Sequence, residues 1–129
     1  MGAKTILIVD DDLVFAQVLD DLLKEAGYQT IVAKDGQEAD IELEIDLPDL
    51  ILADVFMPIS NGLGLCRSVR ANDATRQTPI VVMSAMPRHH YAIPVLIDGF
   101  LLKPFDMDAL LDLVASLIET PPKEKQVGA

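Results

Sequence analysis

The stretch from Leu50 to Pro58 constrains the fold of this chain more than any other. Its first four residues, Leu50-Ile51-Leu52-Ala53, are all apolar, Asp54 follows them, and Pro58 ends the run. A short apolar run bounded by turn residues is typical of a strand buried on both faces, as in a parallel sheet. Asp54 is then expected at the carboxyl end of the strand, where open α/β sheets bind ligands. Taken alone, an Asp at such a place is more often a helix or turn cap, so its meaning depends on the rest of the chain.

Apolar, strand-like runs alternate with helical patterns along the chain. After the capping residue Asp12, for example, Val18, Leu19, Leu22 and Leu23 recur at helical spacing and are expected to face the core. This alternation predicts an α/β fold with a doubly wound parallel sheet and helices on both faces, although it does not determine the strand order. The ranges expected as strands are 5–9, 28–33, 50–54, 79–83 and 100–102, and those expected as helices are 13–26, 37–47, 63–71 and 107–118.

The composition excludes several classes of function. Ten Lys and Arg against 21 Asp and Glu give a net charge of −11, which disfavours direct binding to nucleic acid or to an anionic membrane. No apolar run approaches the length of a membrane span. The single cysteine, Cys66, cannot form an internal disulfide and is expected to pack in the core rather than to react. We therefore expect a cytoplasmic protein that is a monomer or a weak homodimer.

Polar residues stand at the ends of four predicted strands. They are Asp10 and Asp11 after the first, Asp54 at the third, Ser84 at the fourth and Lys103 after the fifth. Because parallel strands end at one edge of a sheet, these five side chains can converge on one crevice. Each alone has a simpler explanation as a cap, a turn residue or a solvated lysine, so the inference depends on their occurring together.

Together these residues fit one kind of chemistry. Neighbouring carboxylates repel each other unless a cation joins them, and hard oxygen ligands suit Mg²⁺. A carboxylate beside Mg²⁺ can attack a phosphoryl group and form an aspartyl phosphate. A lysine ammonium and a hydroxyl nearby would neutralise the charge on the phosphoryl oxygens. The pattern therefore predicts phosphoryl transfer onto an aspartate.

These motifs resemble the receiver domains of two-component response regulators. The matching stretches are Ile6–Asp12, Asp49–Pro58 with Gly62 after it, Val82–Ala85 and Lys103–Phe105. The resemblance extends over about residues 4–119 and implies the flavodoxin-like strand order 2-1-3-4-5. We accordingly expect a receiver domain over residues 1–119, and a polar tail or the start of a linker at 120–129.

The resemblance also implies which residues hold a metal. Asp54 resembles the phosphoacceptor, which also contacts the Mg²⁺. Asp11 resembles the direct metal ligand, and Asp10 resembles its water-mediated companion. Phe56 would offer its backbone carbonyl to the same ion.

Three further residues match the family's machinery for transfer and switching. Ser84 and Lys103 resemble the hydroxyl and the ammonium that contact the phosphoryl group, and Phe100 resembles the aromatic residue that moves on phosphorylation. The implied function is to take a phosphoryl group from a histidine kinase or a phosphotransfer protein, and then to change the partner-binding surface. Because the transfer is self-catalysed, we expect a signalling module rather than an enzyme.

One segment departs from the family pattern. Ser84 and Lys103 lie 19 positions apart, a few fewer than is usual, and Pro87 and Pro94 stand between them. We expect the family's fourth helix to be shortened or replaced by a loop here. The adjacent histidines, His89–His90, are expected to be exposed loop residues rather than metal ligands.

Two other residues bear on how long a phosphoryl group would persist. The positions two beyond the phosphoacceptor and two beyond the hydroxyl tune this lifetime in the family, and here they are Phe56 and Met86. Neither side chain can orient an attacking water by hydrogen bonding. The sequence therefore predicts slow self-dephosphorylation.

Three alternative functions would also be compatible with parts of this pattern. A phosphorylation-independent interaction module on the same fold would carry the site residues as relics. A Mg²⁺-dependent phosphohydrolase would need a second acid two positions after its nucleophile, where this chain has Phe56. A flavin-binding flavodoxin would need a Ser-, Thr- or Gly-rich phosphate loop where Asp10–Asp12 would repel the phosphate.

Overall fold

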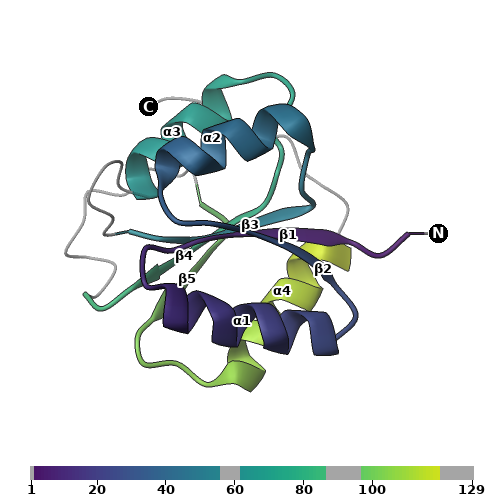
Figure 1. Cartoon of the computed structure of the whole chain (residues 1–129), viewed down its shortest axis with the longest axis vertical. Coiled ribbons are helices and arrows are strands. Elements are labelled where there is room, and N and C mark those ends of the chain that lie inside the picture. Colours follow the sequence, from purple (N-terminus) through teal and green to yellow (C-terminus); the bar gives the residue numbers. More distant parts are fainter. Residues whose placement is uncertain (1, 56–61, 87–96, 120–129) are drawn as a thin grey trace.

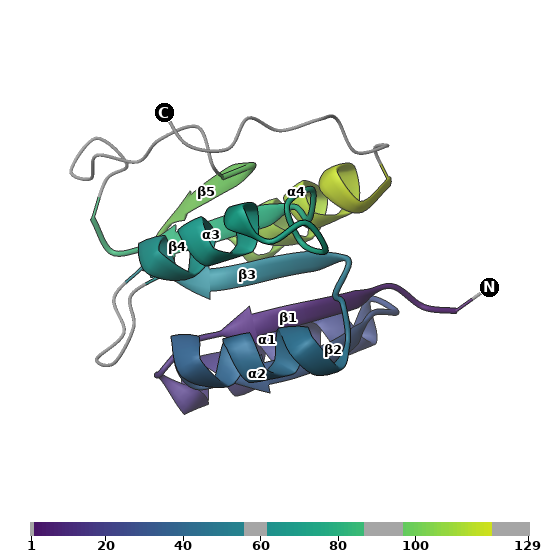
Figure 2. The same ribbon diagram turned by 90° about the horizontal axis from the view of Figure 1, so that it is seen from above.

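The computed structural model of the chain describes residues 2–55, 62–86 and 97–119 (Figure 1). Its strands are β1 (Thr5–Val9), β2 (Gln29–Ala33), β3 (Leu50–Asp54), β4 (Ile80–Ser84) and β5 (Gly99–Leu102), and its helices are α1 (Leu13–Glu25), α2 (Gly36–Ile45), α3 (Gly62–Ala71) and α4 (Met107–Glu119). The strands form one parallel sheet in the order β2-β1-β3-β4-β5. Figure 2 shows β1, β3 and β5 pointing toward the same edge. The predicted fold class and the flavodoxin-like strand order are confirmed.

The sheet separates two helical layers. α2 and α3 cover one face, and α1 and α4 cover the other (Figure 1). Ile51 of β3 belongs to the core on the α2–α3 side together with Val69, whereas Leu52 belongs to the core on the α1–α4 side together with Leu19. Successive residues of β3 thus point to opposite faces, and both faces are buried. This explains why the strand is apolar throughout.

The first helix begins and ends within one residue of the prediction, and Leu19 and Leu23 are buried as expected, but its inward face is only partly the predicted one. Asp12 caps α1 with its side chain, and Gly27 beyond the helix has a φ of 103°, which favours glycine. Val18 is 47% exposed, so the prediction that it faces the core was wrong. The buried residues of the helix are Ala16, Leu19, Asp20 and Leu23. Asp20 can lie on this face because its carboxylate accepts a hydrogen bond from the Thr30 hydroxyl.

A buried arginine ties α3 to the beginnings of β4 and β5. The Arg70 side chain is 1% exposed, and its guanidinium donates hydrogen bonds to the backbone carbonyls of Arg76 and Thr78 at 3.0 and 2.6 Å. It also donates to the Asp98 carboxylate at 2.8 Å. The same carboxylate oxygen accepts the backbone N–H of Ile80 at 2.8 Å. These contacts fix the amino ends of the two strands, at the sheet edge opposite the polar strand ends.

Two expectations drawn from composition can be compared with the structure. Cys66 is 1% exposed, and burial raises the pKa of its thiol to about 11, in keeping with a packing role. Within the described ranges, none of the helices combines the length and the apolar composition that crossing a bilayer requires.

Three predictions fall outside the described residues. They concern the shortened fourth helix between Met86 and Ile97, the loop position of His89–His90, and the polar tail at 120–129. Each stays a prediction.

Candidate functional site

The carboxyl ends of the strands bring the predicted site residues to one edge of the sheet. Asp10 follows β1, Asp54 is the last residue of β3, Ser84 is the last residue of β4, and Lys103 follows β5. The ladder continues one residue past the end of β5, where the Lys103 N–H donates to the Ser84 carbonyl at 2.7 Å. The register of the sheet therefore sets how far each of these side chains projects beyond the edge.

Three carboxylates form an acidic cluster at this edge. Asp10, Asp11 and Asp54 each offer an oxygen, and these oxygens all lie within 4.8 Å of one another. Asp10 is fully buried and Asp54 is 8% exposed, whereas Asp11 is exposed. The Lys103 ammonium lies 3.4 Å from Asp54 Oδ2 and 3.6 Å from Asp10 Oδ2. Lys103 thus pairs with two of the three acids, and among the described residues the cluster keeps an excess of negative charge.

Asp10 is the carboxylate whose environment opposes its charge most clearly. Burial raises the pKa of Asp10 to about 6 from 3.8, while the hydrogen bond from the Asp12 N–H and the charge of Lys103 act to lower it. The Asp12 N–H reaches Oδ1 at 2.9 Å. Among the described residues, Oδ2 has no hydrogen-bond partner. A buried carboxylate oxygen that accepts no hydrogen bond is suited to bind a cation, because the cation would offset the free-energy cost of removing the oxygen from water.

An aromatic ring that the sequence did not single out holds Lys103. The Lys103 ammonium lies 4.6 Å from the centroid of the Phe15 ring, close enough for a cation–π interaction. Phe15 in turn packs edge-to-face against Phe105, with ring centroids 6.0 Å apart and planes at 73°. Helical spacing places Phe15 among the apolar residues of α1, so nothing local in the sequence indicates its contact with Lys103.

The remaining predicted site residues are Ser84, Phe100 and Phe56. Ser84 is fully buried, and its hydroxyl oxygen accepts the backbone N–H of Met86 at 2.9 Å. Phe100 is partly buried and packs against the core on the α2–α3 side of the sheet. Phe56 lies outside the described residues.

Comparisons with known proteins support the family indicated by the motifs. The response regulator receiver domain family matches residues 6–115. The response regulator PleD of Caulobacter vibrioides is 37% identical over 120 residues, which are 91% of this chain and 26% of PleD.

Solved structures are similar as well. The signal receiver domain of a signal transduction histidine kinase from Syntrophus aciditrophicus has a TM-score of 0.83 and 32% identity, and the match covers 90% of each chain. The response regulator TrrA from Thermotoga maritima, solved in complex with Mg²⁺-BeF, has a TM-score of 0.80 and 28% identity. That match covers 88% of this chain and 98% of the other.

The match extends over most of this chain but over only part of many relatives. The chain spans about half the length of the first curated relatives that it matches. The shared part is the fold that carries the acidic cluster. The family match and the structural similarity together show that this chain belongs to the response regulator receiver domain family, whose function is phosphorylation-dependent signalling.

Proposed function

We propose that this chain accepts a phosphoryl group onto Asp54 from a histidine kinase or a phosphotransfer protein, in a Mg²⁺-dependent reaction. The observation that carries this proposal is the meeting of three carboxylates, with oxygens within 4.8 Å, and the Lys103 ammonium 3.4 Å from Asp54. The cytoplasm is the compartment that we propose for the transfer. The chain would act as a receiver of the group rather than as an enzyme with a turnover of its own.

The donor set fits a magnesium ion. Asp10, Asp11 and Asp54, with the backbone carbonyl of Phe56, would hold it. The buried Oδ2 of Asp10, which accepts no hydrogen bond from the described residues, supports this assignment. When bound, Mg²⁺ supplies positive charge that offsets the repulsion among the carboxylates and the charge of the incoming phosphoryl group.

Asp54, Lys103 and Ser84 would each have a different role in phosphoryl transfer. An oxygen of Asp54 attacks phosphorus, and the bond from phosphorus to the donor's histidine nitrogen breaks as the new O–P bond forms. That nitrogen keeps the electron pair of the broken bond. Lys103 neutralises charge on the phosphoryl oxygens, and the Ser84 hydroxyl donates a hydrogen bond to one of them.

The same contacts would operate a switch. The Ser84 hydroxyl oxygen accepts from the Met86 N–H, so turning it toward a phosphoryl group changes the β4–β5 edge beside it. Phe100 is only partly buried and packs against the core on the α2–α3 side of the sheet. We propose that phosphorylation favours inward packing of Phe100 and so changes the surface offered to a partner.

The proposal is tested by incubating the whole chain with acetyl phosphate and Mg²⁺ and measuring intact mass. We expect the wild type to gain one phosphoryl group, and the Asp54→Asn variant to gain none. A wild type that gains nothing would support the interaction module instead. Continuous release of phosphate with many turnovers would support the phosphohydrolase. As a control, removing Mg²⁺ with a chelator should abolish the gain of a phosphoryl group by the wild type.

The phosphorylated state is expected to be long-lived. Phe56 and Met86 cannot position a water for attack on the aspartyl phosphate, so hydrolysis lacks a general base at these positions. After removal of the donor, the phosphorylated fraction followed by intact mass should decay over many minutes or longer. Met86→Asn, which restores a hydrogen-bonding group, should shorten the decay several-fold. A wild-type decay within seconds would contradict this expectation.

Phe15 is expected to affect the rate of transfer through Lys103. A cation–π contact contributes about 0.5–2 kcal/mol, so Phe15→Leu should slow phosphorylation by acetyl phosphate by about two- to thirtyfold. Phe15→Tyr keeps the ring face and should react at close to the wild-type rate. Urea unfolding of both variants checks that the fold is kept. Equal rates for the Leu variant and the wild type would show that Phe15 does not position the ammonium.

A further inference from the structure

A groove lies between α2 and α3, away from the acidic cluster. It measures about 750 Å³ and is lined by the carboxyl-terminal half of α2, the end of α3 and the loop after it. The lining residues are Asp40, Leu43, Glu44, Ile45, Asp46, Leu47, Ser68, Val69, Asn72, Ala74 and Thr75. Because α2 leads into the first residue of β3, the groove lies toward the sheet edge opposite Asp54.

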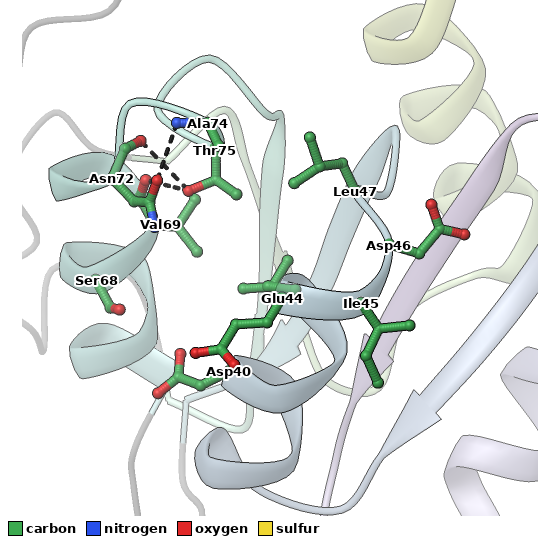
Figure 3. A pocket seen from close by; sticks show the side chains of 11 residues that line it. Asp40, Glu44, Ile45, Asp46, Leu47, Ser68, Val69, Asn72, Ala74 and Thr75 are labelled. Atoms are coloured by element: carbon green, nitrogen blue, oxygen red, sulfur yellow. Dashed lines mark hydrogen bonds between the residues drawn. The ribbon is translucent and has the colours of Figure 1, made fainter.

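The groove offers apolar surface that the fold leaves uncovered. Val69 is buried and Leu43 is partly buried, so these two side chains belong to the core beneath the groove. Ile45 and Leu47 are 73% and 51% exposed. Figure 3 shows the Leu47 side chain pointing across the groove toward Thr75. An exposed apolar strip with a polar rim is typical of a protein-binding surface.

The rim of the groove is acidic. Asp40 and Glu44 are exposed, and their carboxylates extend from α2 toward α3 (Figure 3). Asp46 adds a third acid at the end of the helix. Among the described residues that line the groove, there is no Lys, Arg or His to balance them.

These acids destabilise the helix that carries them. Asp40 and Glu44 are spaced i,i+4, where like charges repel each other. Glu44 lies at the negative end of the helix dipole, and the last turn of α2 contains no basic residue. Positive charge on a bound partner would offset both unfavourable interactions.

We propose that this groove binds a basic amphipathic helix of a partner protein. Its leucine or isoleucine side chains would pack on the exposed Ile45 and Leu47, and its lysines or arginines would pair with Asp40 and Glu44. Charge complementarity favours this occupant over a second copy of the chain, which carries a net charge of −11 itself. The proposal does not depend on phosphorylation of Asp54.

The test uses a synthetic helical peptide with leucines spaced i, i+3 and i+7 and lysines elsewhere, titrated into the whole chain. Amide NMR shifts should map to residues 40–47 and 68–75. The Asp40→Asn/Glu44→Gln double variant should bind about tenfold more weakly, and Leu47→Ser should bind several-fold more weakly. The double variant should keep its fold, with a thermal midpoint unchanged or raised by about 1–4 °C, since it relieves repulsion.

The matched control is Asp112→Asn/Glu119→Gln on α4, where both residues are exposed and the change in net charge is the same. This variant should bind the peptide like the wild type. If it loses as much affinity, or if the shifts scatter over the chain, the attraction is non-specific and the proposal is overturned. Shifts in the groove that grow with protein concentration without peptide would assign the surface to self-association instead.

Discussion

Replacing Arg70 by alanine is expected to lower the free energy of unfolding by about 3–5 kcal/mol, the usual cost of breaking a buried ion pair. Arg70 is 1% exposed and bonds two backbone carbonyls as well as the Asp98 carboxylate. Removing it takes a donor away from two partly buried backbone carbonyls and from the Asp98 carboxylate, and it opens a cavity between α3 and the sheet. Urea unfolding measures the change. A loss of this size approaches the whole stability of a small domain.

Two further variants keep this prediction decisive. Arg70→Lys retains the charge but not the forked geometry, so it should remain folded with an intermediate loss of about 1–3 kcal/mol. Arg67, an exposed residue of the same helix, serves as the matched control, and its alanine variant should change stability by no more than about 0.5 kcal/mol. An Arg70→Ala protein within 1 kcal/mol of the wild type would show that the pair contributes little.

The fold could be predicted because its information is local. Most of the strands contain a continuous apolar run, and at the central strand the polar residue that ends the run is adjacent to it in the sequence, as Asp54 is to Ala53. Since parallel strands end at one edge, the convergence of Asp10, Asp54 and Lys103 follows from the fold class alone. The sequence did not specify which neighbours support these groups.

The contacts that could not be predicted join residues that are distant in the sequence. Arg70 meets Asp98 across 28 positions, and Phe15 of α1 meets Lys103, which follows β5. A charged residue in a helix is predicted to be exposed, because burial of its charge is unfavourable unless a partner arrives from elsewhere. Asp20 is a second charged residue of this kind, since the Thr30 hydroxyl on the neighbouring strand allows it to lie on the inner face of α1. Pattern analysis identifies the groups that do chemistry more readily than the groups that hold them.

Asp10→Asn is expected to stabilise the metal-free protein near neutral pH. Burial raises the pKa of Asp10 from 3.8 to about 6, so keeping this group ionised at pH 7.5 weakens folding by an amount of order 1–3 kcal/mol. The asparagine removes that charge while its carbonyl oxygen can still accept the Asp12 N–H that now reaches Oδ1. Urea unfolding in a chelating buffer should therefore show a higher midpoint for the variant.

The pH dependence has a definite sign. Between about pH 4 and pH 6 the folded state holds a proton on Asp10 that the unfolded state has already released. This group's contribution to stability therefore falls as pH rises through that window. The advantage of Asp10→Asn over the wild type should be near zero at about pH 4 and complete above about pH 6.

Magnesium should reverse the order of the two proteins. If Asp10 helps to hold the ion, Mg²⁺ binds the folded wild type and stabilises it by mass action, whereas the Asn variant gains much less. At saturating Mg²⁺ and pH 7.5 the wild type should approach or exceed the variant in unfolding free energy. Equal stabilisation of both proteins by Mg²⁺ would place the ion away from Asp10. A variant less stable than the wild type in chelator would show that burial of this carboxylate is already compensated without a metal.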